Sequence, residues 1–100
     1  MRELILTPQA FDDIRSARHW YETQREGLGP AFEDSLDAAF ERIRRMPHAG
    51  RAIEPPFRQI PLRRFPYEVF YEFDATRILI VLVFHTSRDP AAASARLREH

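Results

Sequence analysis

Residues 67–85, YEVFYEFDATRILIVLVFH, decide the fold of this chain. In residues 67–73, the apolar or aromatic residues at odd positions alternate with Glu68, Phe70 and Glu72. This alternation predicts a strand with one apolar and one mixed face. Residues 77–85 are apolar on both faces, as is typical of a central strand. Asp74-Ala75-Thr76 predicts the hairpin turn that joins these strands. Residues 57–65 predict a further strand, which lies at an edge or is bulged because its Pro61 cannot donate a ladder hydrogen bond.

The N-terminal half predicts one strand, at residues 2–6, and two helices. Thr7-Pro8 starts the first helix, with threonine as N-cap and proline at the first helical position. An apolar stripe carries this helix to about Gln24, and residues 26–30 break it. A second apolar stripe predicts a second helix that ends at Pro47, because the residue before a proline disfavours helical geometry. The stripes are Ala10, Ile14, Ala17 and Tyr21, and then Phe32, Leu36, Ala39, Phe40, Ile43 and Met46.

The short break between the helices predicts an antiparallel helical hairpin. Residues 48–56 predict a loop, and the Ala- and Arg-rich segment after Asp89-Pro90 allows a short C-terminal helix. The element order βααβββ predicts an α+β fold of two layers, in which the helical hairpin packs on a mostly antiparallel sheet. We expect residues 1–100 to form a single domain.

The predicted core joins the helical hairpin to one face of the sheet. It comprises Phe11, Ile14, Tyr21, Phe32, Leu36, Phe40 and Ile43 on the helices, and Val69, Tyr71, Ile80 and Leu82 on the strands.

Composition excludes several classes of protein. With 44% hydrophobic residues, 30% charged residues and a net charge of zero, bulk electrostatic binding of nucleic acid is disfavoured, and we expect no direct DNA binding by this chain alone. The absence of cysteine excludes disulfides and thiolate sites, and fits a reducing cytoplasm. The longest apolar run, residues 78–84, is far shorter than the roughly 20 residues that span a bilayer. We expect a small soluble cytoplasmic domain without a signal peptide.

Charge is divided unevenly along the chain. Residues 1–41 carry four Arg against nine acids, and residues 42–100 carry eleven Arg against six acids. All 15 cations are arginine, which excludes lysine chemistry and favours planar recognition of carboxylates and phosphates. Most of the excess lies in residues 42–64, where Glu54 is the single acid. This division predicts a charged partner for each half.

Few residues offer catalytic chemistry. The four histidines have no metal-ligand spacing and the three glycines form no phosphate loop, so we expect neither a metal nor a cofactor. The remaining candidates lie in the basic sheet region: Arg58, Arg63, Arg64, His85 and Arg88. One interpretation is a phosphate-binding surface where His85 exchanges a proton. The other is an edge strand that charge protects from aggregation.

Several short motifs follow one another along the whole chain. They are Trp20-Tyr21, Leu28-Gly29-Pro30-Ala31-Phe32, Pro47-His48-Ala49-Gly50-Arg51, Arg63-Arg64-Phe65-Pro66-Tyr67, Val69 with Tyr71, and His85-Thr86-Ser87-Arg88-Asp89-Pro90. In the order and spacing of these motifs, the chain resembles the RelE/ParE toxin superfamily of type II toxin–antitoxin modules. The Arg-Phe-Pro-Tyr and His-x-x-Arg-Asp-Pro segments resemble the ParE branch more than the RelE branch.

The ParE resemblance implies a growth-inhibiting toxin of a plasmid-stabilization type of module, which acts by binding DNA gyrase without catalysis of its own. RelE-like toxins instead cleave mRNA on the ribosome with basic residues and usually an aromatic hydroxyl near the C-terminus. Here no tyrosine follows Tyr71, and Glu68 stands where many relatives carry arginine. A carboxylate there would repel a scissile phosphate. We therefore expect no catalytic residues.

Two alternatives stay open. A ribosome-dependent mRNA endonuclease would use Arg64 and Arg88 to stabilise charge and His85 as acid or base. A toxin homologue that has lost activity would retain only antitoxin binding, because Glu68, and Ala93 where relatives often carry tryptophan, depart from the family pattern.

The resemblance also implies a cognate ParD-like antitoxin, whose C-terminal segment is disordered alone and wraps the toxin. An acidic segment of this kind would place its apolar anchors in grooves beside the helices. The antitoxin-binding residues that we predict on this basis are Arg42, Arg45, Arg51, Arg58 and Arg63.

Overall fold

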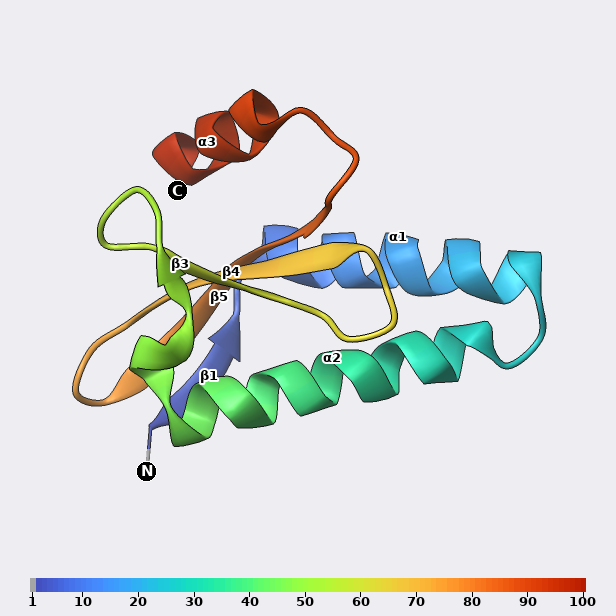
Figure 1. The fold of residues 1–100 in the computed structure, drawn as a ribbon, viewed down its shortest axis with the longest axis horizontal. Helices are drawn as coiled ribbons and strands as arrows, with labels where there is room; N and C mark the ends of the chain where they lie inside the picture. Colours follow the sequence, from blue (N-terminus) through green and yellow to red (C-terminus); the bar gives the residue numbers. More distant parts are fainter. Residues whose placement is uncertain (1) are drawn as a thin grey trace.

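The computed structural model describes residues 2–100 as a five-stranded sheet, a hairpin of two long helices and a C-terminal helix (Figure 1). The strand order is β1-β5-β4-β3-β2, in which β1 pairs with β5 in parallel and the other pairs are antiparallel. The predicted α+β fold and the C-terminal helix are confirmed. The elements are β1 (Glu3–Leu6), α1 (Pro8–Gln24), α2 (Leu28–Arg45), the 3-10 helix η1 (Pro47–Ala49), β2 (Arg51–Ala52), β3 (Arg58–Pro61), β4 (Tyr67–Phe73), β5 (Arg77–His85) and α3 (Pro90–Glu99).

Strand β5 is buried on both faces and separates two apolar clusters. The inner cluster joins the sheet to α1 and α2, and the outer cluster joins it to α3. Residues of β5 alternate between the clusters, as its pleat requires, except that the consecutive residues Val81 and Leu82 both belong to the outer cluster. The inner cluster includes Tyr21, Phe32, Leu36, Ile43, Val69, Tyr71 and Ile80. The outer cluster includes Phe57, Phe70, Leu79, Leu82, Phe84 and Leu97.

Two residues of the predicted inner core lie elsewhere. The pairing of β4 with β5 slips between Phe70 and Tyr71, so that Phe70 pairs with Leu82 and Tyr71 with Ile80. This bulge inserts one residue into β5 and turns Leu82 to the outer face, since such an insertion reverses the alternation. Phe11 is 50% exposed on α1. Ile14 and Phe40 pack at the margin of the inner cluster, partly buried.

The turn between α1 and α2 is shorter than predicted, because α2 begins at Leu28 and includes Gly29 and Pro30 in its first turn. Pro30 is tolerated there because the first backbone N–H groups of a helix need no intrahelical partner. Gly27 adopts a left-handed conformation, with φ of 93°. The Glu22 carboxylate accepts hydrogen bonds from the N–H groups of Gly29, at 2.8 Å, and Gly27, at 3.1 Å. A carboxylate of α1 thus caps the N-terminus of α2.

The predicted loop at residues 48–56 contains the last two residues of η1 and the two-residue strand β2. Strand β2 occupies the sheet edge and pairs with Arg58 and Gln59. The sequence predicts that residues 57–65 lie at an edge or are bulged, and at Arg58 and Gln59 they do not lie at the edge. Pro61 lies at the end of β3, beyond the last residue that pairs with β2. Pro61 has no backbone N–H, and at its position no second neighbouring strand requires one.

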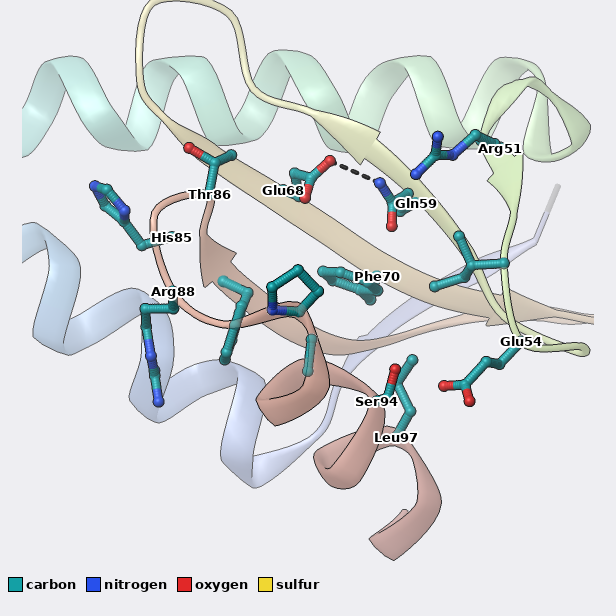
Figure 2. A pocket seen from close by; sticks show the side chains of 14 residues that line it. Arg51, Glu54, Gln59, Glu68, Phe70, His85, Thr86, Arg88, Ser94 and Leu97 are labelled. Atoms are coloured by element: carbon teal, nitrogen blue, oxygen red, sulfur yellow. Dashed lines mark hydrogen bonds between the residues drawn. The ribbon is translucent and has the colours of Figure 1, made fainter.

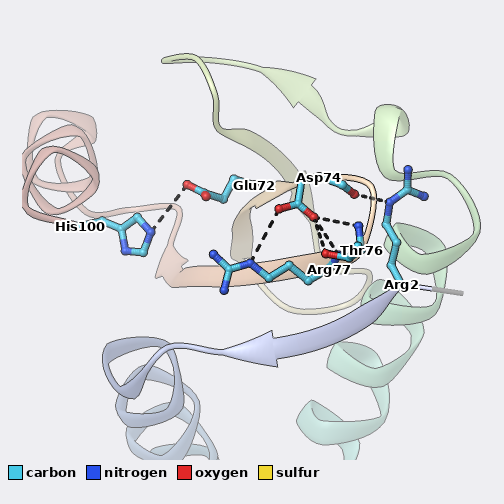
Figure 3. A network of polar contacts seen from close by, with 6 residues as sticks. All are labelled: Arg2, Glu72, Asp74, Thr76, Arg77 and His100. Atoms are coloured by element: carbon cyan, nitrogen blue, oxygen red, sulfur yellow. Dashed lines mark hydrogen bonds and ion pairs between the residues drawn. The ribbon is translucent and has the colours of Figure 1, made fainter.

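The hairpin turn between β4 and β5 is organised by Asp74, as Figure 3 shows. Its Oδ1 accepts hydrogen bonds from the backbone N–H of Thr76, at 2.8 Å, and of Arg77, at 3.0 Å, and from the Thr76 hydroxyl. These bonds, that of the Thr76 N–H foremost, hold the pKa of Asp74 below its ordinary value. The Arg2 guanidinium donates to the Asp74 carbonyl and ties the start of β1 to the same turn.

Truncation of Phe32 to alanine is expected to lower the free energy of unfolding by about 3–5 kcal/mol, because the ring is fully buried between α2 and the sheet. Chemical denaturation measures this loss. The matched control is Phe11→Ala, where a half-exposed ring is expected to cost no more than about 0.5 kcal/mol. Equal losses in the two variants would contradict the core described above.

Acid is expected to destabilise the fold through Glu22 and Asp74. Hydrogen bonds from Gly29 and Gly27 lower the pKa of Glu22, as those at the turn lower that of Asp74. A group with a lowered pKa in the folded state stabilises the protein above its unfolded pKa, and this contribution disappears as the pH falls through the folded value. Urea midpoints measured from pH 7 down to pH 3 should therefore fall less steeply in a Glu22→Gln, Asp74→Asn variant than in the wild type. If the urea midpoints of the two proteins fell equally steeply with pH, Glu22 and Asp74 would not be the source of the acid sensitivity.

Candidate functional site

A cavity of about 270 Å³ lies on the outer face of the sheet beside α3 (Figure 2). Strands β3, β4 and β5 form its floor, and Ala93, Ser94 and Leu97 of α3 form one wall. Glu68 of β4 lies over this floor and accepts a hydrogen bond from the amide of Gln59 on β3, at 2.7 Å. The cavity exists only because α3 folds back over the sheet.

The cavity holds charges of both signs. Arg51 and Glu54 lie at the end nearer β2, and His85 and Arg88 lie at the other end (Figure 2). One carboxylate oxygen of Glu54, Oε2, is buried without a hydrogen-bond donor among residues 2–100. With Glu68 this places two carboxylates in one cavity, an arrangement that disfavours a polyanionic ligand.

Local contacts fix the orientation of His85 and Arg88. The backbone N–H of Ser87 donates to His85 Nδ1, at 3.0 Å, which leaves Nε2 to carry the proton of the neutral ring. The Arg88 guanidinium lies over the Phe84 ring, 4.3 Å from its centroid. Two of the three residues that a nuclease would use, His85 and Arg88, therefore lie close together. Arg64 does not line this cavity; it is exposed in the β3–β4 loop, with φ of 76°.

A second hollow, of about 340 Å³, lies between the C-terminal end of α2 and strand β3. We call it the α2–β3 groove. Its lining is mostly apolar and its rim carries two arginines: the residues are Arg42, Ile43, Met46, Ala49, Ile60, Pro61, Arg63 and Tyr71. Met46 is 65% exposed. Burial, followed by the nearby charge of Arg63, lowers the pKa of Arg42.

The floor of the α2–β3 groove depends on Tyr71, whose hydroxyl is buried. It donates to the Pro47 carbonyl, at 2.6 Å, and accepts from the Gly50 N–H, at 3.1 Å. A Cβ at position 50 would collide with this hydroxyl, which explains the glycine. The sequence predicts that Tyr71 lies in the core but does not predict this bond, because nothing local to Tyr71 or Gly50 indicates their proximity.

The five predicted antitoxin-binding arginines do not form one surface. Arg42 and Arg63 share the α2–β3 groove, and Arg51 lines the outer cavity. Arg45 is exposed in the last turn of α2. Arg58 donates to the carbonyl oxygens of His48 and Gly50, so its side chain holds the loop before β2.

No three His, Asp or Glu side chains within residues 2–100 are grouped closely enough to hold a metal ion. Over the same residues, no helix is long and apolar enough to cross a membrane.

The model of the family described as the ParE toxin of the type II toxin–antitoxin system parDE matches residues 4–90. The chain belongs to the ParE toxin family. This match includes the helical hairpin and all of the sheet except Glu3, the first residue of β1, and it ends at Pro90, the first residue of α3. The predicted resemblance to the RelE/ParE superfamily, on the ParE side, is thereby confirmed.

Solved structures of ParE and RelE systems share this fold. The chain is similar to one from the chromosomal ParDE toxin–antitoxin system of P. aeruginosa, with a TM-score of 0.66 and 18% identity over 87% of this chain and 98% of that one. It is also similar to the isolated E. coli RelE toxin, with a TM-score of 0.62 and 19% identity over the full length of both chains. At these identities the likeness concerns the fold alone. Among curated proteins, none matches the chain.

Proposed function

We propose that this protein is a cytoplasmic toxin that a cognate ParD-like antitoxin neutralises, and that it inhibits DNA gyrase by binding, without catalysis of its own. Membership of the ParE toxin family supports the toxin role. The observation that favours binding over cleavage is the position of Glu68 on the floor of the outer cavity, hydrogen-bonded to Gln59.

The carboxylate of Glu68 lies in the cavity that also holds the histidine and arginine needed for phosphate chemistry. A scissile phosphate bound beside His85 and Arg88 would therefore meet a negative charge. At separations of about 4 Å this repulsion amounts to about 1–4 kcal/mol, depending on the local dielectric. It opposes the transition-state stabilisation that a nuclease requires.

One observation favours the second candidate, a ribosome-dependent mRNA endonuclease. His85 and Arg88 line the same cavity, so an imidazole and a guanidinium are close together. In that reaction His85 would act as acid or base and Arg88 would stabilise charge on the phosphate. The third candidate, a homologue that only binds antitoxin, predicts no growth inhibition at all.

Induction of the chain without antitoxin distinguishes these functions. Gyrase inhibition predicts DNA-damage signalling, filamentous cells and loss of supercoiling in an assay with purified gyrase. Inhibition by binding involves no proton transfer, so this function predicts no cuts in mRNA. Cuts mapped inside translated codons that disappear in His85→Ala would instead establish the nuclease. Normal growth on induction would establish the inactive homologue.

The α2–β3 groove is the site that we propose for the antitoxin. Its apolar lining fits aliphatic side chains of a disordered segment that orders on binding. Arg42 and Arg63 stand on its rim, and neither forms an ion pair within residues 2–100. Two adjacent cations beside an apolar hollow favour a peptide that places a carboxylate next to its apolar anchor.

Neutralising Arg42 and Arg63 together, each to glutamine, is expected to weaken antitoxin binding about tenfold and to flatten its salt dependence. The control is Arg25→Gln with Arg44→Gln, which removes the same charge at exposed positions outside the groove. Affinities for the antitoxin encoded beside the toxin gene, measured at 50 and 300 mM salt, compare the two variants. Equal effects in both would show that only net charge matters, and would contradict the groove assignment.

A further inference from the structure

A third hollow, of about 400 Å³, lies between α1 and the end of β5. We call it the α1–β5 groove. Three segments that are distant in the sequence meet there: Trp20 from α1, Tyr67 from the start of β4, and His85 with Arg88 from the end of β5 and the turn after it. Asp12 and Asp13 of α1 complete its wall. It shares no lining residue with the α2–β3 groove.

The floor of the α1–β5 groove is a rigid aromatic assembly. The Tyr67 ring meets His85 edge to face, with centroids 5.0 Å apart, and meets Tyr21 in the same way at 6.1 Å. Tyr21 stacks on the fully buried Phe32, which anchors the assembly in the inner cluster. Side chains held this firmly lose little conformational entropy when a partner binds.

Trp20 stands at the edge of this floor and is 55% exposed. Its ring meets Tyr21 edge to face, with centroids 5.0 Å apart, so the indole is held in place while much of its surface faces water. The fold gains little from a tryptophan in this position. A fixed and exposed tryptophan is characteristic of residues that dominate the affinity of protein–protein interfaces.

The charges of the groove indicate the class of partner. Arg88 lies over the Phe84 ring and has no carboxylate within 4.0 Å among residues 2–100. On the facing wall, Asp13 is bound by Arg96 and by the Val83 N–H, whereas Asp12 makes no such bond within residues 2–100. A nucleic-acid backbone would have to bring its phosphates past Asp12. A protein segment with a single carboxylate avoids this repulsion.

We propose that the α1–β5 groove binds a segment of the target protein that places an apolar side chain on Trp20 and a neighbouring carboxylate on Arg88. This inference rests on the proposed function, in which the toxin acts by binding a protein. It separates the surface for the target from the surface for the antitoxin. His85 and Arg88 line both this groove and the outer cavity, so the target segment reaches the turn after β5 from the side of α1.

The test compares Trp20→Ala and Arg88→Glu with two controls on the same molecule. Phe11→Ala removes another half-exposed aromatic ring of α1, and Arg15→Glu reverses an exposed cation of that helix; neither residue lines the groove. Thermal unfolding establishes that each variant is folded. The measurements are growth arrest on induction, the toxin concentration that half-inhibits purified gyrase, and the affinity for the antitoxin encoded beside the toxin gene.

We expect Trp20→Ala and Arg88→Glu each to raise the half-inhibiting concentration at least tenfold and to relieve growth arrest, while antitoxin affinity changes less than twofold. Both controls should behave as the wild type. Folded groove variants that arrest growth like the wild type would overturn the inference. So would an equal loss of antitoxin affinity, because the groove would then be an antitoxin site.

Two further outcomes have separate meanings. If wild-type protein leaves gyrase active and cuts no mRNA, but the groove variants still relieve growth arrest, the gyrase proposal is wrong and the groove serves another target protein. Asp12→Asn distinguishes a nucleic-acid partner, since removal of this acid would strengthen phosphate binding. Inhibition that becomes several-fold stronger in Asp12→Asn would overturn the inference in favour of nucleic acid, whereas unchanged or weaker inhibition supports a protein segment.

Discussion

The burial of β5 on both faces is the constraint on which the rest of this structure depends. A strand that is apolar on both faces must be covered on each side, and here α1 and α2 cover one side and α3 covers the other. The pairing with β1 ends at Ile80, so the later part of β5 also needs hydrogen-bond partners at that edge. Asp13 of α1 supplies one by accepting from the Val83 N–H, and its carboxylate also binds Arg96 of α3. One side chain thus joins both layers to the central strand.

Much of the fold could be predicted because its signals are local. The bounds of β4 and β5 and the end of α1 agree with the predictions, since alternation, turn residues and caps act within a few positions. The bulge in β5 could not be predicted, because a run of consecutive apolar residues carries no alternation to read. Strand β2 was missed for a related reason: two residues contain no periodicity, and only their pairing with β3 defines them.

The binding surfaces were harder to predict than the fold. The arginines of residues 42–64 are near one another in sequence, yet the turns around η1 and β2 direct them to different faces. Arg58 serves the loop carbonyls, a role that no property of the residue itself indicates. His85 and Arg88 were correctly placed together because they follow one strand. The meeting of Trp20 with Tyr67 and Arg88 required the tertiary packing of α1 against the sheet.

Helix α3 has a consequence for handling the protein. The family match ends where this helix begins, so a chain shortened to the matched residues would keep the helical hairpin and nearly all of the sheet. Its sheet would nevertheless present Phe70, Leu82 and Phe84 to water without the Leu97 side chain that packs against them. A contiguous apolar sheet face of this kind promotes self-association. A protein trimmed to the family boundary would therefore be prone to precipitate, and the C-terminal helix acts as the solubilising cover of the outer face.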